Sequence, residues 1–210
     1  MIKILVADDH AIVRAGLKQI LADTADMVVA GEATNGREVL EHVRKDDWDL
    51  ILLDLAMPGK GGLETLKELK KEKPKLPVLV LSIYTEEQYA LRALKAGASG
   101  YLTKESAPEE LIVAIGKVAQ GGKYFSSTLA ANLVRYIEQD AEKPVHRMLS
   151  DREYQVMLLI ASGRTVMEIA NETCLSVKTV STYRSRALTK MGMKNNSVFT
   201  NYAIRNGLIY

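Results

Sequence analysis

The chain lacks several features that would assign it to particular classes of protein. Its 210 residues include one cysteine, Cys174, so no disulfide can form within the chain and a reducing compartment is expected. Its apolar runs, such as residues 78–81, are much shorter than the roughly 20 residues that cross a bilayer. Asp8 and Asp9 interrupt the apolar residues 1–7, so the start does not fit a secretory signal. These absences predict a cytoplasmic protein with no membrane partner.

An excess of charge of one sign is also missing, because the formal net charge is only +2. The charges are nevertheless unevenly distributed. Residues 1–122 hold 16 Lys and Arg against 19 Asp and Glu, residues 123–144 hold three of each, and residues 145–210 hold nine against four. The near-neutral total therefore hides an acidic first part and a basic last part. Such asymmetry predicts two modules with different partners, the second suited to a polyanion.

The first 122 residues alternate between short apolar runs and amphipathic helical patterns. This alternation predicts a doubly wound α/β fold, with a five-stranded parallel sheet covered by helices on both faces. Ser106 and Glu109 form a predicted capping box before the last of its helices. Strands are expected at residues 1–7, 27–33, 49–53, 77–81 and 99–102. Helices are expected after residue 9 (with Ile12, Leu17, Ile20 and Leu21 on one apolar face) and at residues 37–45, 63–73, 86–96 and 108–119.

Polar residues stand where the predicted strands end. Asp8 and Asp9 follow the first strand, Asp54 follows the third, Ser82 ends the fourth, and Lys104 follows the fifth. In doubly wound sheets the functional crevice lies beyond the carboxyl ends of the strands. Three carboxylates gathered there repel one another unless a hard divalent cation such as Mg²⁺ is bound. The pair Asp8–Asp9 alone would also fit a solvated turn before a helix, but the complete set favours a site.

This order of residues resembles the receiver domain of two-component response regulators. The matching pieces are Asp8-Asp9, Asp54 with Met57-Pro58-Gly59 and Gly62, Ser82, Tyr101 and Lys104. The resemblance implies a flavodoxin-like fold over residues 1–122, with Asp54 accepting a phosphoryl group from a sensor histidine kinase. Lys104 would pair with the phosphoryl oxygens, Ser82 would donate a hydrogen bond to them, and Tyr101 would change rotamer. Taken singly, Ser82 fits an ordinary strand-end hydroxyl and Tyr101 a partly buried aromatic residue.

The same resemblance implies a metal site and a limited role in catalysis. Mg²⁺ or Mn²⁺ would be held by Asp9, Asp54 and the Ala56 carbonyl, with Asp8 acting through water. The protein would not be an enzyme for external substrates, although it would take part in its own phosphorylation and dephosphorylation. Ala56 and Tyr84 flank the site and would tune hydrolysis of the acyl phosphate.

Helical start and stop signals dominate the end of the chain. Residues 123–144 form a predicted linker with a helix over residues 126–139. Beyond it, capping boxes stand at Ser150 with Glu153 and at Thr165 with Glu168. Two helices joined by a tight turn predict a helix-turn-helix within an all-α four-helix domain over residues 145–210. The four helices are expected from residue 150 to Gly163, at residues 165–173, at 177–191 and at 195–206.

The second helix of the predicted motif has one apolar and one basic face. Val180, Ala187, Leu188 and Met191 would point inward. After Glu172 the chain has no acidic residue and six basic ones, which suits the phosphates of DNA. A basic helix face can also be simply solvated, so the charge alone does not decide.

The last 66 residues resemble the LuxR-type DNA-binding domain, and the whole chain resembles a NarL/FixJ-family regulator. The supporting runs are Leu149-Ser150-x-Arg152-Glu153, Glu168-Ile169-Ala170, Leu175-Ser176-x-Lys178-Thr179-Val180-Ser181-Thr182-Tyr183 and Gly207-Leu208. The resemblance implies phosphorylation-controlled, sequence-specific binding to double-stranded operator DNA as a homodimer, with RNA polymerase as a further candidate partner. Predicted base contacts are Ser181, Thr182, Arg184 and Ser185, and predicted phosphate contacts are Lys178, Thr179, Tyr183, Arg186 and Lys190.

Two departures from the LuxR pattern and one ambiguity remain. Asp151 replaces a usual proline, and Val166-Met167 replaces a polar pair, which removes one expected phosphate contact. The last helix is the expected dimer surface, but its apolar residues would also fit an ordinary core. These residues are Val198, Tyr202 and Ile204.

Three other functions are compatible with parts of the pattern. A Mg²⁺-dependent phosphohydrolase would use Asp54 as a covalent nucleophile, but no residue clearly supplies its general acid. A phosphorylation-switched adaptor would bind protein through its tail, and binding to random DNA would distinguish it. A DNA-binding protein that is never phosphorylated is disfavoured by the complete set of acids, hydroxyl and lysine.

Overall fold

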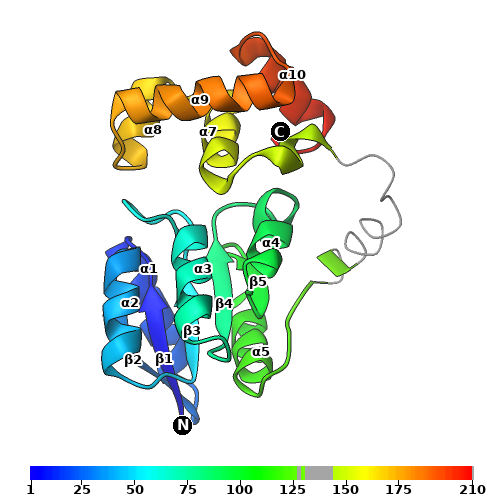
Figure 1. Cartoon of the computed structure of the whole chain (residues 1–210). Coiled ribbons are helices and arrows are strands. Elements are labelled where there is room, and N and C mark those ends of the chain that lie inside the picture. Colours follow the sequence, from blue (N-terminus) through cyan, green and yellow to red (C-terminus); the bar gives the residue numbers. More distant parts are fainter. Residues whose placement is uncertain (127–128, 131–143, 210) are drawn as a thin grey trace. The chain divides into compact units, whose positions relative to one another are not determined.

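The computed structural model describes residues 1–126, 129–130 and 144–209 (Figure 1). Contacts divide the chain into two units, Met1–Ala131 and Asn132–Tyr210. The first unit contains β1 (Ile2–Ala7), α1 (Ala11–Ala22), β2 (Met27–Ala33), α2 (Gly36–Lys45), β3 (Leu50–Leu53), α3 (Gly62–Glu72), β4 (Val78–Ser82), α4 (Glu86–Lys95), β5 (Gly100–Thr103) and α5 (Pro108–Ala119). The second contains the 3-10 helix η1 (Val145–Met148), α7 (Asp151–Ala161), α8 (Val166–Glu172), α9 (Val177–Met191) and α10 (Asn196–Arg205).

The first unit has the predicted five-stranded parallel sheet, in the order β2-β1-β3-β4-β5. β1 and β3 are its inner neighbours, and their residues are buried on both faces: Ile4, Leu5, Leu50 and Ile51 have no exposed surface. Continuous burial explains why these strands read as unbroken apolar runs rather than as alternating ones. The doubly wound fold expected from the sequence is confirmed.

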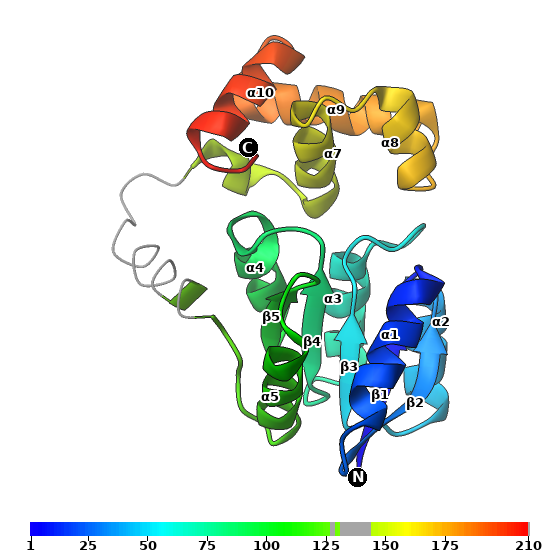
Figure 2. The same ribbon diagram turned by 180° about the vertical axis from the view of Figure 1, so that it is seen from behind.

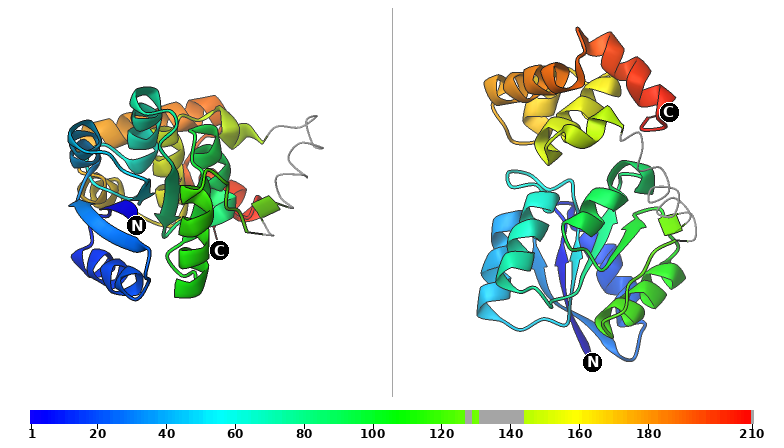
Figure 3. Two further views of the ribbon diagram at one scale, coloured as in Figure 1. Left: turned by 90° about the horizontal axis from the view of Figure 1, so that it is seen from below. Right: turned by 45° about the vertical axis from the view of Figure 1, so that its right-hand side comes forward.

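Helices cover the sheet on both sides (Figures 2 and 3). α1 and α5 lie on one face, where their apolar residues share a core with alternate residues of the strands. α2, α3 and α4 lie on the opposite face. The strand residues in the first core are Ile4, Val6, Leu50, Leu52, Leu79, Leu81 and Leu102.

Two local predictions in this unit are wrong. Ile12 is 88% exposed, not on the apolar face of α1. At about 100° per residue, Ile12 lies roughly 140° around the helix from Leu17, so Val13 takes the inward position instead. The capping box of α5 is also absent: Ala107 is the N-cap, with no side-chain cap and with Pro108 at the helix start. Ser106 lies one residue too early, in a turn where its N–H donates to the Thr103 carbonyl.

The second unit is built around α7, which is buried along nearly its whole length and packs against α9 and α10. Both capping boxes predicted here are present, with Ser150 accepting from the Glu153 N–H and Thr165 from the Glu168 N–H. Gly163 has φ 87°, a left-handed conformation in which glycine ends a helix at little cost. The 3-10 helix η1 was not expected from the sequence.

The predicted linker begins against the first unit. Tyr124 forms an isolated parallel bridge with Gly100 of β5, and Leu129 is buried. The helix predicted at residues 126–139 lies almost entirely outside the described residues. The domain boundaries at residues 122 and 145 therefore stay predictions.

Candidate functional site

The register of the sheet brings the strand-end residues together. Ala7 of β1 pairs with Leu53 of β3, so Asp8 and Asp54 leave the sheet side by side. The N–H of Asp54 donates to the Ala7 carbonyl (2.9 Å). Ser82 pairs with Thr103, and the N–H of Lys104 donates to the Ser82 carbonyl (2.8 Å). The backbone ladder itself thus collects the predicted acids, hydroxyl and lysine at one edge.

Lys104 joins the two buried acids of this site. Its Nζ lies 2.6 Å from Asp8 Oδ2 and 2.8 Å from Asp54 Oδ2, and the two carboxylate side chains are 3% and 1% exposed. Burial raises the pKa of Asp54, Lys104 lowers it and the Asp8 charge raises it again, so the pKa remains above its usual value. Burial alone would lower the pKa of Lys104, but the Asp54 and Asp8 charges raise it. The lysine is therefore a fixed cation at neutral pH.

Both oxygens of Asp54 are held in place. Oδ2 accepts from Lys104, while Oδ1 accepts from the Ala56 N–H (3.1 Å). The chain after Asp54 must also leave room for α3, which begins at Gly62. A Cβ on Gly62 would lie 2.2 Å from the Asp54 carbonyl oxygen and 2.5 Å from Leu55 Cα. Glycine is needed there because any side chain would push α3 away from the end of β3.

Ser82 and Tyr101 are connected through the backbone of Tyr84. The Tyr84 N–H donates to Ser82 Oγ (3.3 Å), and the Tyr101 hydroxyl donates to the Tyr84 carbonyl (2.7 Å). Ser82 and Tyr101 have no exposed surface, so the Tyr101 side chain is fully buried and not partly buried. Burial also raises the pKa of the Tyr101 hydroxyl, which keeps it a hydrogen-bond donor. A movement of the loop after Ser82 would therefore alter the support for Tyr101.

Two residues at the site were not identified from the sequence. The ring nitrogen Nδ1 of His10 lies 3.2 Å from Asp8 Oδ1 and 3.0 Å from Asp9 Oδ1. Arg14, one turn into α1, donates from Nη1 to the Asp8 carbonyl (2.8 Å) and from Nε to Glu32 (2.9 Å). The position of His10 directly after the acid pair was the available signal. The role of Arg14 depends on how α1 packs and had no signal in the sequence.

The acidic cluster has the composition of a cation site. One ligand atom from each of Asp8, Asp9, His10 and Asp54 lies within 4.8 Å of the others. Carboxylate oxygens are the ligands that hard divalent cations prefer, and the charges of Asp8, Asp9 and Asp54 together exceed the positive charge of Lys104, which favours a further cation. The residues present therefore fit a divalent metal ion.

The helix-turn-helix forms as predicted, with α8 and α9 joined by residues 173–176. Ser176 caps α9 by accepting from the Thr179 N–H (3.0 Å), and Gly192 ends it with φ 65°. Val180, Ala187 and Met191 point into the core, while Leu188 is only half-buried. The exposed predicted contacts are Lys178, Ser181, Thr182, Ser185, Arg186 and Lys190, and the half-buried ones are Thr179, Tyr183 and Arg184.

Two of the predicted cationic DNA contacts have side-chain partners on other helices of the unit. Arg184 Nε donates to Asn196 Oδ1 of α10 (2.6 Å). Lys190 Nζ pairs with the buried Glu153 of α7 (2.6 Å). By contrast, Lys178, Ser181, Thr182 and Ser185 are spaced i, i+3, i+4 and i+7, so they share one exposed face of α9.

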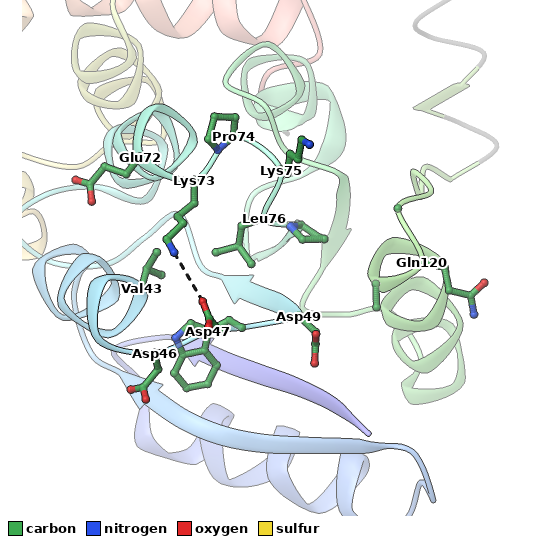
Figure 4. Close-up of a pocket in the computed structure, with 14 residues that line it drawn as sticks. Val43, Asp46, Asp47, Asp49, Glu72, Lys73, Pro74, Lys75, Leu76 and Gln120 are labelled. Atoms are coloured by element: carbon green, nitrogen blue, oxygen red, sulfur yellow. Dashed lines mark ion pairs between the residues drawn. The ribbon is translucent and has the colours of Figure 1, made fainter.

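A pocket of about 740 Å³ lies at the other edge of the sheet, beside the starts of β3 and β4 (Figure 4). Trp48 and Leu76 contribute apolar surface, and Lys73 pairs with Asp47 there (3.8 Å). Because the acidic cluster lies at the carboxyl ends of the strands, this pocket is not part of it.

Among the residues that the structure describes, no helix combines the length and apolarity needed to span a membrane.

Comparisons with known proteins agree with this arrangement. Residues 4–116 match the response regulator receiver domain, and residues 147–203 match the luxR family of bacterial regulatory proteins. Response regulator UvrY of Escherichia coli (strain K12) is 37% identical over 209 residues, covering 99% of this chain and 96% of the relative. Response regulator GacA of Pseudomonas aeruginosa is 37% identical over 211 residues, covering 100% and 98%.

Solved structures show the same relationship. The RcsB response regulator of Salmonella typhimurium has a TM-score of 0.71 at 27% identity, covering 98% of both chains. RcsB bound to a promoter in the presence of the phosphomimetic BeF3⁻ has a TM-score of 0.61 at 28% identity, covering 96% of this chain and 97% of that one. The chain therefore belongs to the response regulators of two-component systems, and it joins a receiver domain to a LuxR-type DNA-binding domain, as transcription regulators of the NarL/FixJ family do.

Proposed function

We propose that Asp54 is the phosphoacceptor and that a sensor histidine kinase supplies the phosphoryl group. The observation that carries this proposal is the buried Asp54 carboxylate, oriented by the Ala56 N–H and by Lys104. An Asp54 oxygen would form the O–P bond while the N–P bond of the phosphohistidine breaks and its electron pair returns to the imidazole. Positioning and charge neutralisation are the main requirements of such a transfer.

The surrounding residues would have separate roles in this step. Asp8, Asp9, Asp54 and the Ala56 carbonyl would hold Mg²⁺ or Mn²⁺, which would offset the negative charge of the phosphoryl oxygens. Lys104 would exchange its ion pairs with the acids for one with the phosphoryl group. Ser82 would donate to the same group, and the shift of its loop would release Tyr101 from the Tyr84 carbonyl.

Phosphorylation would then control dimerisation and the binding of operator DNA by the second unit. The protein would act in the cytoplasm. We infer that α9 enters the major groove with the exposed face that holds Lys178, Ser181, Thr182 and Ser185. The short hydroxyl side chains would reach base edges, and Lys178 would reach a phosphate. Arg184 and Lys190 stay predicted contacts, although they would first have to leave Asn196 and Glu153. The exposed Val198 and Ile204 of α10 are available for the dimer surface, and RNA polymerase remains a candidate partner.

Phosphodonor labelling tests the first unit. We expect Asp54→Asn to abolish Mg²⁺-dependent labelling by radioactive acetyl phosphate. Asp47→Asn should label normally, because Asp47 is fully exposed at the opposite edge of the sheet. Retained labelling of the Asp54 variant would refute the assignment, and turnover of external phosphoesters would favour a phosphohydrolase.

Operator binding tests the second unit. Arg186→Ala should weaken binding to a DNA selected from random sequences, whereas Arg37→Ala on the receiver helix α2, which removes the same charge outside the second unit, serves as the matched control. If the second unit of one chain contacts about four phosphates, a plot of log affinity against log salt concentration should have a slope of about −4 for each bound chain. Binding without salt dependence, or equal affinity of the two variants, would contradict the assigned surface.

A further inference from the structure

We propose that His10 is a metal ligand and that, with Asp8 and Asp9, it gives the receiver a binding site for imidazole-binding ions, namely Zn²⁺, Co²⁺ and Ni²⁺. This inference rests on the metal site of the proposed function and adds a ligand to it. The site would not only accept Mg²⁺ but also respond to ions that bind imidazole. Three ligand atoms carry the inference: His10 Nδ1, Asp8 Oδ1 and Asp9 Oδ1.

The spacing of these atoms suits direct coordination. A metal about 2.1 Å from each ligand separates neighbouring ligand atoms by about 3.0 Å in octahedral and 3.4 Å in tetrahedral geometry. The imidazole nitrogen lies 3.2 Å from Asp8 Oδ1 and 3.0 Å from Asp9 Oδ1, within this range. The Asp54 oxygen completes a group that spans no more than 4.8 Å. Only small movements would bring all four atoms onto one ion.

The site is open to solvent on the His10 side, and backbone contacts hold the loop that carries His10. The side chains of Asp54, Asp8, Asp9 and His10 are 1%, 3%, 30% and 61% exposed, so the imidazole lies on the solvent side of the acids. The backbone N–H of His10 donates to Asp8 Oδ1 (2.9 Å), and the same residue is the N-cap of α1. The loop conformation therefore does not depend on the ring alone.

The chemistry of imidazole decides which ions would use His10. Mg²⁺ prefers oxygen ligands and keeps several waters, so it gains little from a nitrogen. Zn²⁺, Co²⁺ and Ni²⁺ bind imidazole well. A transition metal held by His10 would occupy Asp8 and Asp9, which Mg²⁺ needs for phosphoryl transfer to Asp54. We therefore expect such ions to inhibit phosphorylation through His10.

The test compares the full chain with His10→Asn, since asparagine is favoured at the N-cap position that His10 occupies. Calorimetry should show Zn²⁺ binding at least about tenfold weaker in the variant, with Mg²⁺ affinity changed less than about twofold. The chain has three histidines, so ¹⁵N NMR should show a Zn²⁺-dependent shift at His10, while His42 and His146 act as internal controls. His42→Asn is the matched variant and should bind Zn²⁺ normally.

The outcomes separate this inference from the proposed function. Equal Zn²⁺ affinity of the wild type and His10→Asn, or a shift confined to another histidine, overturns the role of His10. Mg²⁺-dependent labelling of Asp54 is measured independently and would survive that result. If labelling with Mg²⁺ fails in the wild type while the His10 signal still shifts with Zn²⁺, the proposed function fails and the His10 site stands.

Discussion

Replacing Lys104 by methionine removes the cation that bridges Asp8 and Asp54. At about 2.7 Å and an effective dielectric constant near 20, each Lys104–carboxylate attraction amounts to roughly 6 kcal/mol before desolvation. Burial of the three groups offsets most of this sum, and removing one partner of a buried ion pair leaves the other charge uncompensated. The expected destabilisation of the receiver is about 3–5 kcal/mol without divalent cations.

The loss of stability caused by Lys104→Met should increase with pH. Without Lys104, protonation of one of the two carboxyl groups would relieve the repulsion between Asp8 and Asp54. The destabilisation should therefore be larger at pH 8 than at pH 5.5, because fewer carboxyl groups are protonated at the higher pH.

The single tryptophan, Trp48, provides the assay because it lies in the first unit, far from Lys104. Urea unfolding followed by Trp48 fluorescence in a chelating buffer reports the receiver without mixing in the second unit. Lys45→Met, at an exposed position at the end of α2, is the control and should change stability by less than about 0.5 kcal/mol. A Lys104→Met receiver as stable as the wild type, or a loss that does not vary with pH, would refute this electrostatic reasoning.

Three further predictions follow from the same contacts. The pKa of Asp54 is raised, so the folded receiver binds more protons than the unfolded chain between the two pKa values. Its stability should increase as pH falls through the folded pKa toward the unfolded one, and Asp54→Asn should flatten that slope in the Trp48 assay. Gly62→Ala should destabilise the receiver by about 1–3 kcal/mol and slow labelling, since its Cβ meets the end of β3; normal stability by urea unfolding would contradict this. Although burial raises the pKa of Glu153, hydrogen bonds from Lys190 and Ser150 lower it overall, so the stability it contributes is present above the unfolded pKa and is lost as pH falls through the folded one. NMR of α7 amides during acid titration should show this loss, and Glu153→Gln should remove the pH dependence.

Local physical chemistry explains which parts of the fold could be predicted. Short unbroken apolar runs that alternate with amphipathic helical patterns favour strands buried on both faces, and this identified β1, β3 and β4. Side-chain caps such as Ser150 and Thr165 act within three residues, so helix starts in the second unit were also predictable. Ile12 failed because its apolar character suggested burial, although it lies roughly 140° around α1 from the buried Leu17. The cap of α5 failed because a helix that begins at Pro108 has Ala107 as its N-cap, which leaves Ser106 one residue outside the capping position.

The sequence by itself determined the order of strands and helices, the presence of acids, a hydroxyl and a lysine at strand ends, and the basic second helix of the tail. These features depend on residues near one another in the chain and on family resemblance. Only the tertiary structure decided that Lys104 bridges Asp8 and Asp54, and that Arg184 and Lys190 contact Asn196 and Glu153. Each of these contacts joins side chains whose separation is set by sheet register, helix rotation or helix packing, and no local pattern encodes those quantities.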